Sequence, residues 1–515
     1  GFRHYFKHKS ESTESSPSGR HIGHYKAILK NDDLVDLQVA MLNIGLRTGQ
    51  ALDRWKKTIS VMLEKDKGKP KLHRLRIIQL FEADLNFLLS LVFGHRLMTF
   101  ARKHCNINES QYGSMNRKQA QSAVLNKILT YDIFRVTKQD AATTEFDAAA
   151  NYDRIVPALA MIACQRLGLA KKPAELMYNS LIDLKHQVKT IYGLSAEYGP
   201  TADNPLFGSG QGSGGSPTFW AVIADILFNC MDSKGAELVL SNPGGTIVSA
   251  RNEDGYVDDT ALGVDGRDGN VVGRMTTAAQ RHERTLYATG GKLALHKCTW
   301  VLVNWLWCNG NATMETFSEA QDSTSMIDTS TKLTLKQSEN GESVDIQRLQ
   351  PDQGYRTLGI WIAADGNPQK QLKILQATVS HWLECVTNSS LRDLDRQLAY
   401  QSFLRPQLLY LIGCATIDHH DLKKMFRPVL DELLHTLGLN KNFPLALVHA
   451  GHNWMGLGIE DLPTMQGISQ LQLLLGHANK QDRTATLIQI ERDYLELAIG
   501  VGRCPLMEPY IATLE

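Results

Sequence analysis

The segment Asp254-Gly255-Tyr256-Val257-Asp258-Asp259-Thr260-Ala261-Leu262 places two adjacent carboxylates within an apolar stretch flanked by turn residues. Ionised side chains are costly to hold in such a place unless a cation or hydrogen bonds compensate them. A second string, Phe146-Asp147-Ala148-Ala149-Ala150-Asn151-Tyr152-Asp153, carries a third carboxylate at the end of a short strand pattern. Carboxylate oxygens suit Mg²⁺, which keeps open positions for phosphates. Because two such ions about 4 Å apart hold both oxygens of an in-line displacement, the strings together predict phosphoryl transfer.

Composition limits the classes of protein to consider. The chain has 515 residues, enough for two or three domains or for one elongated body with several lobes. Its 43% apolar and 21% charged residues are ordinary for a globular protein, and its formal net charge is +1. None of the eight cysteines forms a Cys-x-x-Cys pair, so we interpret them as reduced core residues of an intracellular protein. No signal peptide and no apolar run of ~20 residues is present, so no membrane partner is expected. The chain begins at Gly1 without an initiator Met, and we expect it to be a fragment of a longer protein.

A basic stretch runs from Arg54 to Arg76. Its basic residues far outnumber its acidic ones, which the stretch has at Glu64 and Asp66. The basic residues are Arg54, Lys56, Lys57, Lys65, Lys67, Lys69, Lys71, Arg74 and Arg76. A nucleic-acid enzyme needs a basic surface, and at this net charge that surface must be local. A solvated loop explains the same density of charge equally well.

Apolar periodicity predicts a helical N-terminal part, a mixed α/β centre and a helical C-terminal part. In the centre, a strand ends at Asp147, and Pro157 opens a helix with Asp153 as a candidate cap. Ser216-Pro217 opens a helix that is apolar nearly all round, with Ser216 as its cap. Two short strands, Gly245–Ala250 and Gly255–Leu262, are expected around the Asp-Asp turn. Alternation of Leu333/Leu335 and Val344/Ile346 around Asn340-Gly341 predicts a hairpin.

Taken in order along the chain, a series of strings from about Ser15 to Tyr410 resembles the polymerase domain of a reverse transcriptase of the non-LTR retrotransposon type. The strings are Ser16–Lys26, Trp55 through Arg76-Ile77-Ile78, Gln111-Tyr112-Gly113, Asp147–Asp153, Gly210-Gln211-Gly212 through Ser216-Pro217, Tyr256–Asp259, Gly290–Lys297, Tyr355–Gly359 and Arg405–Tyr410. The first departs from the Gly-Pro-Asp-Gly form usual in that family. Each string alone is weak evidence, and their order and spacing carry the resemblance.

The resemblance implies an α+β right-hand polymerase fold. Helical fingers would occupy residues 1–140, and a palm with an antiparallel sheet would occupy residues 141–368, including a hairpin insertion at 309–350. A helical thumb and C-terminal extension would occupy residues 369–515. Residues 430–515 suggest no chemistry of their own.

The resemblance also assigns metal ligands. Asp147 and Asp258 would bridge two Mg²⁺ ions, for which Mn²⁺ could substitute, with Asp259 as a third carboxylate near them. The competing interpretation is an Asp-Asp pair in an ordinary surface hairpin, which would be the usual case for an isolated dipeptide.

Substrate contacts follow in the same way. Tyr152 would pack under the sugar of the incoming nucleotide and exclude a 2′-hydroxyl, while Gln211, between Gly210 and Gly212, would contact template or nucleotide. Glycines permit close backbone approach, although this composition is also that of a flexible linker. Tyr152 could equally be a core tyrosine.

Charged and aromatic residues complete the expected site. Lys65 and Arg76 would bind the β- and γ-phosphates, and the other basic residues of their stretch could replace them. Lys297 would donate a proton to the leaving pyrophosphate, with a surface lysine as the alternative. Tyr256 would contact substrate at the catalytic turn.

The function that the resemblance implies is RNA-directed DNA synthesis by a nucleotidyltransferase, with an RNA template, a DNA primer and dNTPs as partners. A nuclear location follows if the source is a eukaryotic retroelement. One alternative is an RNA-dependent RNA polymerase, although these usually have Gly-Asp-Asp at the turn and lack an aromatic gate. Others are a catalytically inactive RNA-binding scaffold and an active enzyme with a cellular role, such as a telomerase-like or maturase-like protein. The oligomeric state is not readable.

Overall fold

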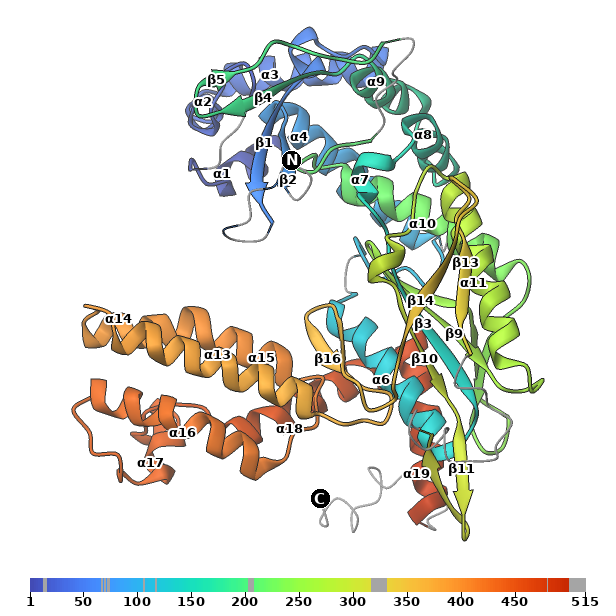
Figure 1. Cartoon of the computed structure of the whole chain (residues 1–515). Helices are drawn as coiled ribbons and strands as arrows, with labels where there is room; N and C mark the ends of the chain where they lie inside the picture. Colours follow the sequence, from blue (N-terminus) through green and yellow to red (C-terminus); the bar gives the residue numbers. More distant parts are fainter. Residues whose placement is uncertain are drawn as a thin grey trace.

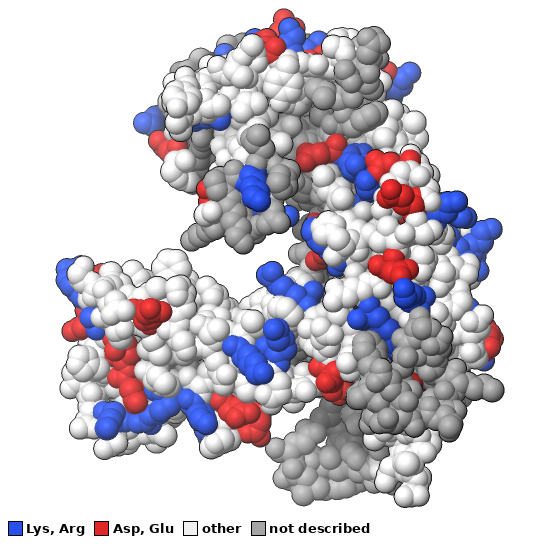
Figure 2. All heavy atoms as spheres, in the orientation of Figure 1, with Lys and Arg blue, Asp and Glu red and all other residues white. Residues whose placement is uncertain are grey.

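The computed structural model describes residues 1–12, 16–65, 68, 71, 75–104, 107–115, 118–201, 208–315, 331–478 and 480–499. Three parts follow one another in Figure 1: an N-terminal lobe of helices around a small sheet, a central sheet flanked by helices, and a C-terminal lobe of helices. The surface is hollowed between the two lobes (Figure 2), and acidic and basic side chains are interspersed over this face. This mixture of helices and mixed sheets agrees with the expected α+β class.

The N-terminal lobe is built around a four-stranded sheet with the order β2-β1-β4-β5. Its strands are β1 (Lys57–Glu64), β2 (Leu75–Leu80), β4 (Lys185–Thr190) and β5 (Gly193–Leu194). Its helices are α1 (Phe2–His8), α2 (Ile22–Ile28), α3 (Asp32–Thr48), α4 (Ala83–Leu89), α5 (Met98–Lys103), α8 (Pro157–Arg166) and α9 (Lys171–Ile182). Strand β4 lies parallel to β1, so the chain returns to this lobe after residue 140, where sequence placed the end of the fingers.

The central sheet has the order β13-β14-β10-β3-β9-β8. Its strands are β3 (Ala141–Asp147), β8 (Glu253–Tyr256), β9 (Asp259–Asp265), β10 (Thr299–Val303), β13 (Leu333–Lys336) and β14 (Ser343–Leu349). On β10, Trp300 and Leu302 belong to one hydrophobic cluster and Val301 and Val303 to another. Because successive side chains of a strand point to opposite faces, β10 is buried on both faces, which explains its unbroken apolar sequence.

Helices cover both faces of this sheet. The cluster on one face includes α10 (Ser216–Asp232) and α11 (Val271–Ala288). The cluster on the other includes α6 (Ala120–Thr137) and α19 (Arg483–Ile499). The sheet is therefore a rigid platform whose strand ends can hold side chains in fixed positions.

The hairpin predicted around Asn340-Gly341 is confirmed, since Leu333 pairs with Ile346 and Leu335 with Val344. Strand β14 also lies parallel to β10, so this hairpin forms the edge of the central sheet. Residues 316–330 of the segment predicted as an insertion lie outside the described residues.

The C-terminal lobe has a hydrophobic core of its own. Its helices are α13 (Gln369–Thr387), α14 (Asp393–Ala399), α15 (Arg405–Ile412), α16 (His419–Thr436), α17 (Leu445–His449) and α18 (Leu462–Ala478). The shorter elements of the chain are η1 (Asp53–Lys56), η3 (Ser90–Leu97), α7 (Asn151–Arg154), β6 (Leu238–Ser241), β7 (Val248–Arg251), η4 (Leu295–Lys297), β11 (Trp305–Cys308), β12 (Asn311–Met314), β15 (Tyr355–Thr357), β16 (Ile360–Ile362), η5 (Tyr400–Leu404) and η6 (His452–Trp454).

Two predicted helix caps are wrong. Helix α8 is preceded by Val156 as its N-cap, and Asp153 lies inside the separate helix α7. Ser216 is the first residue of α10 rather than its cap. Its hydroxyl instead donates to the carbonyl oxygens of Ser209 and Gly210, at 3.0 and 2.8 Å. It therefore ties the helix to the glycine-rich loop of residues 208–215.

Two further sequence interpretations need revision. The Asp-Asp turn lies inside the predicted strand Gly255–Leu262, because β8 ends at Tyr256 and β9 begins at Asp259. The six cysteines in the described part of the chain are free, but only Cys164, Cys298 and Cys414 are buried, so the others are not core residues. No helix among the described residues is long and apolar enough to cross a membrane.

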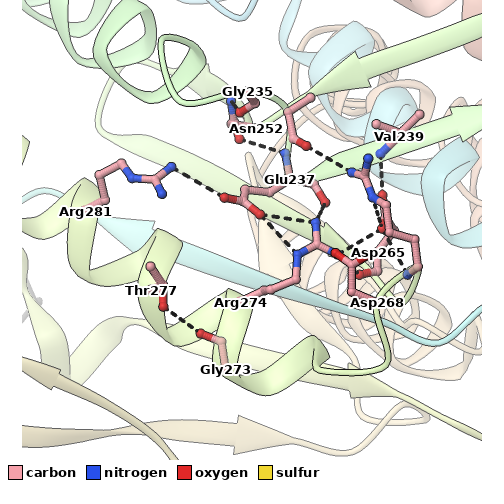
Figure 3. A network of polar contacts seen from close by, with 12 residues as sticks. Gly235, Glu237, Val239, Asn252, Asp265, Asp268, Gly273, Arg274, Thr277 and Arg281 are labelled. Atoms are coloured by element: carbon pink, nitrogen blue, oxygen red, sulfur yellow. Dashed lines mark hydrogen bonds and ion pairs between the residues drawn. The ribbon is translucent and has the colours of Figure 1, made fainter.

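One end of β9 is held by a network of arginines and carboxylates (Figure 3). The buried carboxylate of Asp265 accepts hydrogen bonds from Arg267 Nε at 2.7 Å, Arg274 Nη1 at 3.2 Å and the Val239 N–H at 2.6 Å. Arg274 Nη2 also donates to Glu237 Oε2 at 3.2 Å. The buried charge of Asp265 is thus balanced by arginines of the protein.

Candidate active site

Three aspartates gather at the other end of β9. Asp147, the last residue of β3, pairs directly with Asp259, the first residue of β9. Side chains of directly opposed residues lie on one face, with Cβ atoms about 5 Å apart. Asp258 precedes Asp259 in the two-residue turn, and its carbonyl oxygen accepts the Ala148 N–H at 3.2 Å. The two strings therefore meet at one end of the central sheet, where β3 ends and β9 begins.

The turn itself is strained. Val257 has φ +57°, a conformation that two-residue hairpins usually give to Gly, Asn or Asp and that is exceptional for a β-branched residue. The surroundings enforce it, because Trp220 Nε1 donates to the Val257 carbonyl oxygen. Gly113 also lies so close that a Cβ there would stand 2.5 Å from the Val257 nitrogen. Strain of this kind is typical of functional sites.

The string Gln111-Tyr112-Gly113 lies against the hairpin that carries this turn. The Tyr112 N–H donates to the Gly255 carbonyl oxygen at 2.8 Å, and the Gly255 N–H donates to the Ser110 carbonyl oxygen at 2.9 Å. These bonds add the Ser110–Tyr112 backbone beside β8 and pair both backbone polar groups of Gly255. The resemblance named this string without a role, and the structure places it as a support for the turn.

Burial and neighbouring carboxylates disfavour the charged forms of Asp258 and Asp259. Burial raises the pKa of Asp259 to about 6, and the carboxylates of Asp258, Glu145 and Asp147 add to this, while Lys127 opposes it. Burial likewise raises the pKa of Asp258, with Asp147 adding to the effect and Lys297 and Lys65 opposing it. The site therefore carries negative charge that its own cations offset only in part.

Lys297 lies beside Asp147. Its Nζ is 2.8 Å from Asp147 Oδ1, and both side chains are partly exposed. In the described part of the chain, no three His, Cys, Asp or Glu side chains converge closely enough to form a ready metal site. The carboxylate donors and the excess negative charge nevertheless fit a hard divalent cation. Magnesium at this position stays a prediction.

Tyr152 stands on α7, directly after the strand that ends at Asp147. It is half-buried, and its pKa is raised by burial and by the nearby Asp258 carboxylate. Its carbonyl oxygen accepts the Ser209 N–H at 2.8 Å. This bond connects the aspartate site to the glycine-rich loop.

The glycine-rich loop is wedged against β2. Gly210 and Gly212 have φ +75° and +116°. A Cβ on Gly210 would stand 1.9 Å from Gln79 Oε1, and one on Gly212 would stand 2.3 Å from the Gln79 carbonyl oxygen. The Gln79 N–H also donates to the Gln211 carbonyl oxygen at 2.6 Å. For residues 208–215 the flexible-linker interpretation is therefore wrong.

The basic stretch divides into two groups. Arg54 is an internal ion-pair residue, because it binds the buried carboxylates of Glu82 and Asp84. Lys56 and Lys57 are paired with acidic residues at 2.9 and 2.7 Å. This part of the stretch is thus no basic surface, since its charges are used within the lobe.

Lys65 and Arg76 belong to the later part of the basic stretch. Lys65, at the end of β1, is close enough to Asp258 to lower the pKa of that carboxyl. Arg76 is exposed on β2, opposite Leu63, and Tyr256 ends β8 opposite Asp259. Lys67, Lys69 and Arg74 lie outside the described residues.

Sequence reasoning missed a buried polar group beneath Asp259. Lys127 Nζ lies 2.6 Å from Glu145 Oε2 and 2.6 Å from Thr357 Oγ1. Tyr355 Oη donates to Glu145 Oε1 at 3.3 Å. Glu145 could have been noticed as an acid in an apolar strand two residues before Asp147. Nothing in the sequence connects it to Lys127 or Thr357.

No family model and no curated protein matches the chain. Solved structures that resemble it include the telomerases of Candida tropicalis and Candida albicans, each in complex with the TWJ fragment of telomeric RNA. Both are 13% identical, with TM-scores of 0.35 and 0.34 over 86% and 89% of this chain. The chain spans 65% and 68% of their lengths. Likeness at this level decides neither fold nor function.

Proposed function

We propose that the chain is a reverse transcriptase domain, an RNA-directed DNA polymerase that extends a primer with dNTPs, from a non-LTR retroelement. The observation that carries this is the meeting of Asp147, Asp258 and Asp259 at one end of the central sheet, with Tyr152 and the glycine-rich loop beside them. The order of the motif strings along the chain supports the reverse transcriptase class. In this proposal the N-terminal lobe is the fingers, the central sheet the palm and the C-terminal lobe the thumb.

Asp147 and Asp258, with Asp259 beside them, would hold two Mg²⁺ ions, or Mn²⁺ in their place. When bound, these ions would ease proton loss from the primer 3′-hydroxyl and neutralise the charge on the triphosphate. The protein's own contribution is a strained, braced turn that places the carboxylates before substrate arrives. Such preorganisation costs no reorganisation during the reaction.

Other residues would position the nucleotide. Tyr152 would lie under the sugar and reject a 2′-hydroxyl, and Gln211, held between two packed glycines, would contact template or nucleotide. Lys65 and Arg76 would bind the phosphates, and Tyr256 would line the turn. Lys297, now paired with Asp147, would release that carboxylate and donate a proton to pyrophosphate.

The experiment is primer extension on an RNA template with a DNA primer and Mg²⁺, supplied with either dNTPs or NTPs. Asp258→Ala is compared with the unmodified protein, and Asp153→Ala is the matched control because Asp153 lies outside the aspartate group. Binding of the same primer–template is measured for all three proteins. The proposal expects extension with dNTPs only, lost in Asp258→Ala alone, with binding unchanged.

Two other outcomes would contradict it. Extension with NTPs would indicate an RNA polymerase and remove the role given to Tyr152. Tight binding of the duplex without extension, in either Mg²⁺ or Mn²⁺, would indicate an inactive RNA-binding scaffold.

A further inference from the structure

Helix α19 packs with the central sheet and α6, although it follows the C-terminal lobe in sequence. Leu487 and Ile490 are fully buried in the cluster that contains Val124 and Phe134 of α6 and Val301 of β10. In Figure 1, α19 runs beside α6 and away from α13–α16. The last described segment therefore returns to the platform that carries the aspartates.

The corner between α18 and α19 is tied to α6 by polar contacts. His477 Nε2 lies 3.2 Å from Ser122 Oγ, and its Nδ1 lies 3.1 Å from Asp482 Oδ2. His477 and Ser122 are both buried. These contacts fix the position from which α19 begins at Arg483.

Arg483 reaches from this corner to the base of the hairpin that β8 and β9 form. Its Nη1 lies 2.6 Å from Asp254 Oδ1, 3.2 Å from the Glu253 carbonyl oxygen and 3.1 Å from Ser110 Oγ. The exposed fractions of the Arg483 and Asp254 side chains are 11% and 4%. One guanidinium thus joins β8 to the neighbouring Ser110–Gly113 segment.

This position matters because the segment and β8 together support the strained turn. The Ser110 carbonyl oxygen accepts a hydrogen bond from the Gly255 N–H, and Gly113 lies against the Val257 backbone. Asp254 is also 3.5 Å from Arg251 Nη1, and Arg251 is itself buried. Without Arg483, Asp254 would keep Arg251 as an ion-pair partner but would lose the shorter of its two ion pairs. The contacts that Arg483 makes to the Glu253 carbonyl oxygen and to Ser110 Oγ, which join β8 to the neighbouring segment, would be lost with it.

We infer that Arg483 is a positioning residue: through Asp254, Glu253 and Ser110 it holds the hairpin so that Asp258 and Asp259 face Asp147. This inference rests on the proposed polymerase function for its kinetic consequence. It gives residues 480–499 a role, where sequence suggested none. Arg483 touches no reacting group and acts only through the hairpin.

The test compares Arg483→Met with two controls on the same helix. Arg492→Met removes an arginine whose ion-pair partner, Glu496, lies on α19 itself at 4.0 Å. Leu487→Ala weakens the packing of α19 without touching the contacts of Arg483. All variants are assayed well below their melting temperatures, confirmed by circular dichroism.

We expect Arg483→Met to lower the kcat of primer extension at least tenfold, with the KM for dNTP and the Kd for primer–template within twofold. Arg492→Met and Leu487→Ala should keep kcat within twofold. Arg483→Lys should recover part of the loss, because it restores the charge but not the planar fork of donors. Unchanged kcat in Arg483→Met, or an equal loss in Leu487→Ala, would overturn the inference.

A second measurement separates this inference from the proposed function. Amide hydrogen exchange over residues 253–262 should be at least tenfold faster in Arg483→Met than in Arg492→Met. This readout requires no activity, so it stands if the unmodified protein fails to extend any primer. Equal protection of the hairpin in the two variants would rule out positioning by Arg483.

Discussion

The two ends of β9 hold acidic side chains in opposite environments, with Asp265 buried and Asp259 partly exposed. At one end, Asp265 is surrounded by Arg267, Arg274 and a backbone N–H, and its pKa is lowered by these hydrogen bonds even though burial opposes the shift. At the other end, the pKa of Asp259 is raised to about 6 by burial and by neighbouring carboxylates. At the first end, the negative charge of Asp265 is balanced by the two arginines. The second is left short of positive charge, which is the arrangement expected of a site that binds cations.

The largest expected effect is on catalysis at the uncompensated end. Asp258→Asn should slow primer extension by at least about 10³-fold, or ~4 kcal/mol, because a neutral amide cannot hold the metal that stabilises the transition state. Its melting temperature should not fall, because one of three repelling charges is gone. Single-turnover extension and thermal melts would measure the two effects. Asp153→Asn is the matched control, and a parallel fall in its rate would argue against a special role for Asp258.

The second effect is on stability at the compensated end. Asp265→Asn should destabilise the fold by about 3 kcal/mol, because it leaves Arg274 without part of its buried counter-charge. Urea unfolding monitored by circular dichroism would measure this. If Asp265→Asn and Asp258→Asn changed stability equally and in the same direction, the contrast between the two ends would be wrong.

Adding Mg²⁺ should stabilise the protein through the aspartate end of β9 only, by a smaller amount than the effects above. At a Mg²⁺ concentration ten times its Kd, the folded protein should gain about 1.4 kcal/mol by mass action. Thermal shift titration should detect this gain in the unmodified protein and in Asp265→Asn, but not in Asp258→Asn. A shift that persisted in Asp258→Asn would place the ion elsewhere.

The smallest effect concerns pH. The folded-state pKa of Asp259, about 6, lies above the value of about 4 for an unfolded aspartate. Its ionisation therefore costs stability as pH rises from about 4 through 6, on the order of 1 kcal/mol after allowance for partial exposure. Asp265 behaves oppositely: its contribution is present above its unfolded pKa and is lost as pH falls.

The comparison to make is urea unfolding at pH 5 and pH 7 for the unmodified protein and for Asp259→Asn. The difference between the two proteins isolates Asp259 from the histidines that titrate in the same range. We expect Asp259→Asn to show the smaller loss between pH 5 and pH 7. An identical loss in the two proteins would indicate that Asp259 titrates normally.

Local patterns predicted much of the central sheet. The strand ending at Asp147 and the hairpin that pairs Leu333 with Ile346 both follow from alternation and turn residues, which act over a few neighbours. The predicted caps failed for different reasons: Asp153 lies inside the separate helix α7, and the Ser216 hydroxyl donates to carbonyl oxygens of the preceding loop. Cap residues can bond to any nearby backbone group, and the sequence does not say which is nearest.

The amino-acid sequence by itself determined that three acids lie on strand ends and at a turn within apolar surroundings, because hydrophobic periodicity and turn chemistry are local. Only the tertiary structure decided which charges meet. Arg54 forms ion pairs with Glu82 and Asp84 inside the N-terminal lobe. Asp265 is paired with Arg274. Arg483, which is far from Asp254 in sequence, forms an ion pair with it. Electrostatic energy depends on distance in space and on burial, and neither can be read from separation along the chain.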